Sequence, residues 1–155
     1  MTGGSPGGPL VRQATTGDLA AIVHLFELGA LNPDKEDPRD LAPYAAALTD
    51  IDGAPGDVLV ADVGGEVVGV CQLLVFRHLQ ARGGLCAEVE SVHVRPDWRR
   101  QWIGRVLLRA AIDTARDLGC YRIQLTSNTR RPDAHRFYEA LGFESSHVGF
   151  KLHFS

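Results

Sequence analysis

The sequence predicts an α/β (α+β) domain in which a mixed, mostly antiparallel sheet is flanked by helices. Several short runs rich in β-branched and aromatic residues have the pattern of strands. Gly64-Gly65 separates two such runs, which is typical of a hairpin turn. A strand-like run over residues 85–94 precedes a helical pattern over residues 103–118 and a further strand over residues 121–126. A strand that returns beside its predecessor after a helix lies parallel to it, so one parallel pair is expected.

The N-terminal half is predicted to hold a strand, two helices and the hairpin. A short strand is expected over residues 11–14. Thr16 or Asp18 can cap a helix over residues 19–28, where apolar residues share one face. A polar, proline-interrupted loop then leads to a second helix over residues 41–48. The hairpin strands are predicted over residues 57–63 and 66–76.

The C-terminal half is predicted to alternate strands and helices. Gly119 ends the helix over residues 103–118 as a C-cap. Pro132 suits the first turn of a helix over residues 132–141, which Gly142 closes. Two final strands are expected over residues 143–146 and 150–154. The complete order is therefore β-α-α-β-β-β-α-β-α-β-β.

Length and composition indicate one globular domain over residues 10–155, preceded by a disordered Gly/Pro/Ser-rich tail over residues 1–9. Of the 155 residues, 45% are apolar and 23% charged, and the net charge of −3 gives no argument for nucleic acid or an anionic membrane as a partner. No apolar run approaches the roughly 20 residues of a membrane span, and no signal peptide is evident. The protein is therefore expected in the cytoplasm.

Cysteines and histidines give no sign of a disulfide framework or a metal centre. Cys71, Cys86 and Cys120 are odd in number and lack a C-x-x-C spacing. We expect buried thiols in a reducing compartment. None of the six histidines forms a metal-spaced pair on a helix, so no required metal is predicted.

Residues 89–108 combine the end of a strand, a basic turn and the start of a helix. The first amides of a helix lack partners within it and lie at the positive end of its dipole, so they suit a phosphate group. Gly104 lets the backbone approach a ligand, and Arg99, Arg100 and Arg105 add positive charge. The alternative is an ordinary strand-to-helix junction with an arginine-rich, solvated surface.

Two motifs resemble those of the GNAT superfamily of N-acetyltransferases. Residues 99–104 read RRQWIG and resemble its acyl-CoA-binding motif, Arg/Gln-x-x-Gly-x-Gly/Ala. Asn128 and residues 136–143, RFYEALGF, resemble its second hallmark, FYxxxGF. The motifs follow in the family's order and spacing, and the resemblance covers about residues 10–154. One departure is Trp102, which occupies the place of the first motif glycine and could crowd the pyrophosphate.

The resemblance implies a sheet splayed between its two central parallel strands, with acetyl-CoA in the gap as acyl donor. Tyr138 would lie in the cofactor site and protonate the departing thiolate, although packing against the core is its alternative role. Asn128 would touch the CoA arm, unless it only forms an Asx turn. The backbone of three strand residues would hold the pantetheine arm: Val92, His93 and Val94. The pyrophosphate would be held by residues of the turn and first helical turn: Arg99, Arg100, Gln101, Trp102, Ile103, Gly104 and Arg105.

A base is needed because an ammonium group has no lone pair with which to attack. Glu88 and Glu90 are two residues apart on one strand and share a face. Paired carboxylates beside a gap raise one another's pKa. Glu90 is the expected base or water-polarising group and Glu88 the second candidate, and the alternative is that both face solvent. His93 is expected on the opposite face, acting through its backbone only, unless a bulge inverts the parity.

The acceptor is left open by the sequence. Residues 133–138 and 146–147 resemble the branch that contains aminoalkylphosphonate N-acetyltransferases and many small bacterial acetyltransferases. A phosphonate acceptor would need cations, for which Arg77, Arg82 and Arg131 are candidates. The acidic residues 32–48 instead favour a cationic amine, and small polyamines, amino sugars, amino acids and peptide N-termini all stay possible.

The predicted function is an N-acetyltransferase that moves an acetyl group directly from acetyl-CoA to a primary amine of a small molecule or peptide. The alternative is a non-catalytic acyl-CoA-binding regulatory protein on the same fold, which Trp102 would favour. A homodimer formed through the final strands is expected, because exposed sheet edges need covering.

Overall fold

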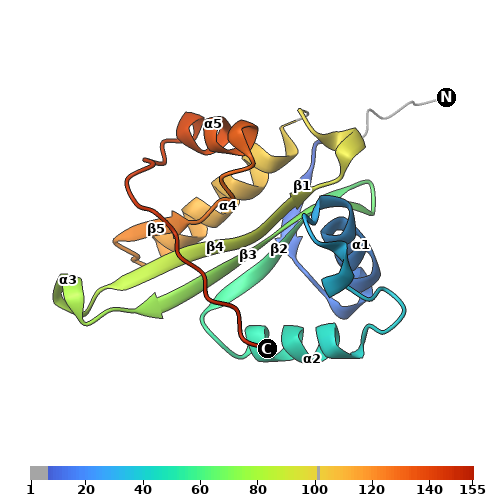
Figure 1. Ribbon diagram of the computed structural model, residues 1–155, viewed down its shortest axis with the longest axis horizontal. Coiled ribbons are helices and arrows are strands. Elements are labelled where there is room, and N and C mark those ends of the chain that lie inside the picture. Colours follow the sequence, from blue (N-terminus) through green and yellow to red (C-terminus); the bar gives the residue numbers. More distant parts are fainter. Residues whose placement is uncertain (1–6, 101) are drawn as a thin grey trace.

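The computed structural model describes residues 7–100 and 102–155, and within them one mixed sheet carries helices on both faces (Figure 1). Its strands, in spatial as well as sequence order, are β1 (Leu10–Gln13), β2 (Gly56–Val63), β3 (Glu66–Arg77), β4 (Leu85–Val94) and β5 (Arg122–Leu125). The helices are α1 (Leu19–Gly29), α2 (Ala42–Asp52), α3 (Gln80–Gly83), α4 (Ile103–Asp117) and α5 (Pro132–Ala140). Most of the predicted disordered tail, residues 1–6, and Gln101 lie outside the described residues.

Strand directions confirm the predicted α/β architecture. β1 to β4 are successively antiparallel, and β4 and β5 form the expected parallel pair. β4 has the predicted bounds, and the other elements up to α5 differ from expectation by a few residues at their ends. The turn between β3 and β4 additionally contains the short α3.

The two final strands were wrongly predicted. Residues 143–155 form no strand, and β5 is consequently the edge of the described sheet, so the parallel pair is not central. A strand needs a ladder of hydrogen bonds to a neighbour as well as an apolar pattern. Here the Ser146 amide donates to the Glu144 carbonyl at 3.0 Å in a local turn. The rest of the segment, red in Figure 1, crosses in front of the sheet.

Two apolar cores lie on opposite faces of the sheet. On one face, α4 is amphipathic and buries Ile103, Leu107 and Leu108 against the strands. On the other face, α1 and α2 bury Leu19 and Leu48 among their apolar side chains. Cys71 and Cys86 are buried as predicted, whereas Cys120 is only half-buried, and all three thiols are free. No described helix combines the length and apolar character needed to span a bilayer.

A buried carboxylate joins the start of α1 to the edge of the sheet. Asp18 occupies the N-cap position of α1 as expected, but its side chain turns back and accepts hydrogen bonds from Arg12 at 2.8 and 2.9 Å and from the Thr15 amide at 2.7 Å. Arg12 also donates to Asp62 at 3.1 Å. The guanidinium, opposed by burial, holds the pKa of Asp18 down at about 2.

Replacement of this carboxylate should make the protein less stable at neutral pH. A lowered pKa means that the stabilisation is present above the unfolded-state pKa and is lost as pH falls towards 2. Asp18→Asn should therefore lower the free energy of unfolding by about 2 kcal/mol at pH 7. In urea titrations the difference should shrink steadily between pH 4 and pH 2. Asp113→Asn is the control, because its ion pair with Arg116 is exposed and should contribute less than about 0.5 kcal/mol. A constant difference across this pH range would contradict the assignment.

Candidate active site

The gap between β4 and β5 is the central feature of the candidate site. The two strands pair from Cys86 with Arg122 to Val89 with Leu125. Beyond that point β4 continues through Val94, whereas the chain leaves β5 after Leu125. Backbone groups of β4 that face such a gap need partners, which a bound molecule can supply. The pairing of β4 with β5 therefore ends at the place where the sequence places the acyl donor.

A β-bulge within β4 decides which side chains face the gap. The pairing with β3 steps from Gln72 opposite Glu90 to Val70 opposite His93, so an additional residue is accommodated on β4. Ser91 takes the left-handed φ of 54° at this step. Because Gln72 and Val70 lie on one face of β3, Glu90 and His93 share a face too. The prediction that His93 faces away from Glu90 was therefore wrong. A bulge inverts the alternation of side chains along β4, which is the exception that the prediction allowed.

His93 packs under the C-terminal end of α1. Its ring centroid lies 5.3 Å from that of Phe26, in an edge-to-face arrangement. Gly29 leaves the room that the imidazole occupies, because a Cβ at position 29 would collide with its Nδ1. Burial lowers the pKa of His93, with Arg131 and Arg99 adding to this and Glu36 opposing it. The imidazole is thus neutral at pH 7 and able to accept a proton.

Glu90 lies half-buried on the same face as Glu88. Burial is the main cause that raises the pKa of Glu90, and the hydrogen bond and charge of Glu88 add to it, while the charge of Lys151 opposes them. Glu88 itself accepts a hydrogen bond from Gln124 Nε2 at 3.0 Å. A carboxylate with a raised pKa is a stronger base than an exposed one.

Tyr138 approaches from the other face of the sheet. It is half-buried on α5, and its ring centroid lies 5.3 Å from that of Phe137 and 6.1 Å from that of Phe143. Burial raises the pKa of Tyr138, with Cys71 adding to this and Arg131 opposing it. The phenol therefore stays protonated at neutral pH and can donate a proton. Packing and proton donation are both compatible with this position.

The two sequence motifs contact each other at the start of α4. A Cβ at position 104 would lie 3.2 Å from Phe137 Cζ, so Gly104 lets α5 pack closely on α4. The absence of a side chain there thus serves packing between helices, in addition to the expected approach of a ligand. Ile103 is buried in the core and fixes the first turn of α4.

The turn before α4 contains two non-glycine residues with a left-handed φ, Arg100 and Trp102. Arg99 Nε donates to the Val94 carbonyl at 3.3 Å, and Arg100 has φ 65°. Trp102 is the N-cap of α4 with φ 70°, a conformation that favours the glycine of the family motif. Its indole is 64% exposed, and the Arg105 guanidinium lies 5.2 Å from the ring centroid. Trp102 therefore lies on the outside of the turn.

The family model for the Acetyltransferase (GNAT) family matches residues 20–143. The chain belongs to the GNAT family. It is similar to aminoglycoside N(6')-acetyltransferase type 1 of Stenotrophomonas maltophilia, with 36% identity over 141 residues, 89% of this chain and 88% of the relative. It is equally similar to the aminoalkylphosphonate N-acetyltransferase of Salmonella typhimurium, with 36% identity over 141 residues, 90% of this chain and 88% of the relative.

Among solved structures, a protein described as a transcriptional regulator from Bacillus halodurans C-125 has a TM-score of 0.90 and 38% identity, covering 94% of this chain and 99% of the other. Family membership and the two named relatives support acetyl transfer to an amine, with acetyl-CoA as the donor that GNAT acetyltransferases use. Both named relatives are N-acetyltransferases, and neither favours the non-catalytic alternative.

Polar contacts around the GNAT gap hold Asn128 and Arg131 in place. Asn128 Oδ1 accepts a hydrogen bond from the Arg130 amide at 2.9 Å, so its side chain forms the Asx turn given as its alternative role. Arg131 Nη2 donates to the Gly29 carbonyl at 2.6 Å and joins α5 to α1. Arg77 instead bonds the Gly83 carbonyl at 2.6 Å, at the α3 end of the molecule, where Arg82 also lies. Of the three cations considered for a phosphonate, only Arg131 is near the gap.

An apolar hollow of about 150 Å³ lies between α1, α2 and the sheet on the Glu90 face. Phe26, Tyr44, Gln72 and Ser91 are among its lining residues. The Tyr44 hydroxyl donates to Glu36 at 2.7 Å. From sequence, Tyr44 was interpreted as structural and Glu36 only as part of the acidic stretch, because it is the fold that brings Tyr44 to the hollow beside Ser91.

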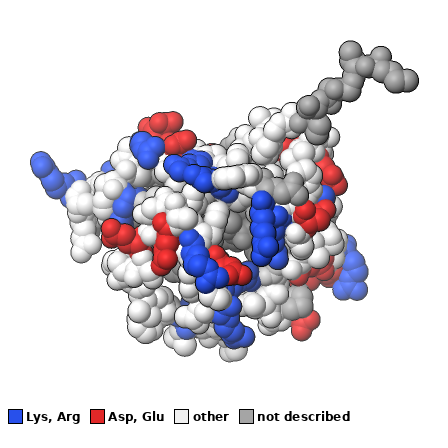
Figure 2. Space-filling model, turned by 90° about the horizontal axis from the view of Figure 1, so that it is seen from above, with Lys and Arg blue, Asp and Glu red and all other residues white. Residues whose placement is uncertain are grey.

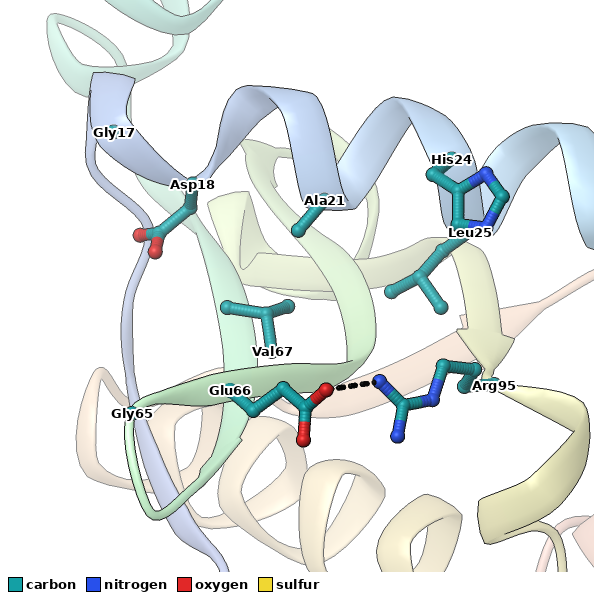
Figure 3. Close-up of a pocket in the computed structure, with 9 residues that line it drawn as sticks. All are labelled: Gly17, Asp18, Ala21, His24, Leu25, Gly65, Glu66, Val67 and Arg95. Carbon is teal, nitrogen blue, oxygen red and sulfur yellow. Dashed lines mark hydrogen bonds and ion pairs between the residues drawn. The ribbon is translucent and has the colours of Figure 1, made fainter.

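A second hollow, of about 270 Å³, lies between the start of α1 and the β2–β3 turn (Figure 3). Its wall includes the ion pair of Arg95 with Glu66 at 2.8 Å. None of the predicted site residues lines it, so we do not assign the acetyl-transfer site to it. The face in Figure 2 carries interspersed acidic and basic side chains rather than one sign. Among the described residues, no group of three or more His, Cys, Asp or Glu could hold a metal ion.

Proposed function

We propose that this protein transfers the acetyl group of acetyl-CoA directly to a primary amine of a small molecule or peptide, at the gap between β4 and β5. The observation that carries the proposal is a pair of half-buried groups on opposite faces of the sheet, Glu90 just beyond the last β4–β5 pair and Tyr138 against the core on the α4 side. Glu90 has a raised pKa suited to a base, and Tyr138 has a raised pKa suited to an acid.

Acetyl-CoA would lie along the unpaired end of β4. The backbone of Val92, His93 and Val94 would bond the pantetheine arm as a neighbouring strand would. The pyrophosphate would lie at the N-terminus of α4, where free amides and the helix dipole favour an anion. The predicted contacts there are Arg99, Arg100, Gln101, Trp102, Ile103, Gly104 and Arg105, with Asn128 beside the arm.

The transfer would need two proton movements. Glu90 removes a proton from the acceptor ammonium, and the freed lone pair attacks the thioester carbonyl carbon. As the C–S bond breaks, the thiolate takes the Tyr138 proton and leaves as CoA. Neutral His93, on the same face as Glu90, is the alternative proton acceptor.

The acceptor would be a cationic amine. Glu36 and Glu90 supply negative charge around the bulge, and the apolar hollow beside Tyr44 can take the carbon part of the molecule. Arg131, together with the similarity to the Salmonella enzyme, makes an aminoalkylphosphonate the second candidate.

The test is release of CoA thiol from acetyl-CoA against a panel containing amino sugars, polyamines and aminoalkylphosphonates. We expect release that depends on an amine acceptor, fastest with the cationic amines. A best rate with the phosphonates would reverse the order of the two candidates. Binding of acetyl-CoA without release on any amine would contradict the catalytic proposal.

We further propose that the protein forms a homodimer. We also propose that it works in the reducing cytoplasm. Apolar side chains at alternating positions of the crossing segment, defined as residues 147–155, are 77% to 92% exposed: Val148, Phe150, Leu152 and Phe154. Exposed apolar rows of this kind mark protein interfaces. The open edge of β5 lies nearby. Three free thiols fit a reducing compartment.

Light scattering after gel filtration tests the dimer. We expect a mass of twice 16.8 kDa for the protein and a monomer for Phe150→Ser combined with Phe154→Ser. Leu79→Ser is the control, because Leu79, the N-cap of α3, is 99% exposed but lies outside the crossing segment, so the variant should leave the dimer intact. A monomeric parent protein would contradict the dimer.

A further inference from the structure

The crossing segment passes over the end of β5, and all of its residues are exposed. A Cβ at position 149 would lie 3.5 Å from Thr126 Cγ2, so Gly149 faces the residue that follows β5. In an extended chain, side chains two positions apart share a side. Lys151 lies two positions beyond Gly149 and is exposed, as Phe150 and Leu152 are. Figure 1 shows this segment crossing in front of β5, β4 and β3.

Glu90 lies within reach of Lys151. Val89 and Leu125 form the last pair between β4 and β5, so Glu90 and Thr126 are the next residues on either side of the gap. Neighbouring strands are about 4.8 Å apart, and two residues of extended chain advance about 6.6 Å. A four-carbon lysine stem covers a distance of this order. The charge of Lys151 also acts on Glu90, where it opposes the rise in pKa that burial causes.

We propose that Lys151 Nζ is an acetyl acceptor of this enzyme, so that the protein modifies its own crossing segment. The proposal rests on the proposed function. Glu90 takes one proton from the Lys151 ammonium, and the neutral amine attacks the thioester carbonyl. The new C–N bond forms, the C–S bond breaks, and the CoA thiolate takes the Tyr138 proton. The products are N-acetyl-lysine and CoA, and the lysine charge beside Glu90 is lost.

The composition of the chain makes the site easy to assign. Lys35 is the other lysine of the sequence, and the remaining basic residues besides histidine are arginines, which this chemistry does not acetylate. Lys35 is exposed at the end of the short 3-10 helix Pro33–Lys35 before α2 and serves as the matched control.

The experiment is incubation of the full chain with isotope-labelled acetyl-CoA and no added amine, followed by peptide mass spectrometry. We expect one acetyl group on Lys151, added about 100-fold faster than on Lys35. Lys151→Arg should abolish it and Lys35→Arg should not. Glu90→Gln should slow it about 100-fold. Equal labelling of both lysines, or unchanged labelling in Glu90→Gln, would mean spontaneous acetylation and would overturn the proposal.

Thiol release with external amines separates this inference from the proposed function. The thiol-release assay is also run on Lys151→Arg, which cannot be acetylated at position 151. Turnover of an external amine without acetyl-Lys151 would overturn the inference and leave the proposed function standing. Acetyl-Lys151 without external turnover would support the inference and restrict the enzyme to its own chain. If neither acetyl-Lys151 nor an acetylated external amine forms, both the inference and the proposed function are overturned.

Discussion

Tyr138→Phe should lower kcat about 100-fold and change the dissociation constant of acetyl-CoA less than about twofold. The hydroxyl matters mainly as negative charge develops on sulfur, which happens in the transition state and not in the bound substrate. The ring itself, which contacts Phe137 and Phe143, is retained in the variant. The measurement is steady-state CoA release together with calorimetric binding of acetyl-CoA.

Tyr121→Phe is the matched control for this experiment. Its hydroxyl lies 2.8 Å from His78 Nδ1, away from the gap, and its loss should leave kcat within about twofold. Equal turnover of Tyr138→Phe and the parent protein at neutral pH would remove Tyr138 from the role of acid. A fall in acetyl-CoA affinity as large as the fall in kcat would assign the hydroxyl to binding instead.

Glu90→Gln should lower the rate about 100-fold at pH values where Glu90 is ionised and the acceptor is still ammonium, with a smaller effect at high pH. At low pH nearly all of the acceptor is ammonium and needs the base, whereas at high pH free amine is already present. In the parent protein the rate should fall as pH drops through the raised pKa of Glu90, because protonation removes the base. The measurement is kcat/KM against pH for both proteins.

Glu139→Gln is the control for the loss of one carboxylate. Glu139 is exposed on α5, next to Tyr138 in sequence, and the variant should keep the parent pH profile. A pH profile for Glu90→Gln that matches the parent would transfer the role of base to Glu88, to neutral His93 or to water.

The parts of the fold that the sequence predicts well are those with a local cause. Gly64 and Gly65 both take positive φ at the β2–β3 turn, so the hairpin could be read from two residues. The helix α4 carries its own apolar stripe and ends next to Gly119, which is also left-handed. Residues 150–154 have a strand pattern as well, but a strand exists only where another strand pairs with it.

The sequence predicts those parts of the site that follow from a motif or from the alternation of side chains along a strand. It does not predict contacts between segments that are distant in the chain. Glu88 and Glu90 share a face as their spacing predicts. The side of His93 could not be fixed, because the bulge centres on Ser91, and no glycine marks the positive φ there. The contact of Arg131 with the Gly29 carbonyl joins residues 102 positions apart and has no local signal.

The central claim is that acetyl-CoA binds between β4 and β5, and amide hydrogen exchange with and without acetyl-CoA tests it most directly. Bound ligand should slow exchange at those amides of Val92, His93 and Val94 that face the gap and in the first turn of α4, because its acceptor atoms would bond these amides. Exchange in β1 and in the β2–β3 turn should stay unchanged. Protection confined to the hollow of Figure 3, or no protection at saturating acetyl-CoA, would contradict the account.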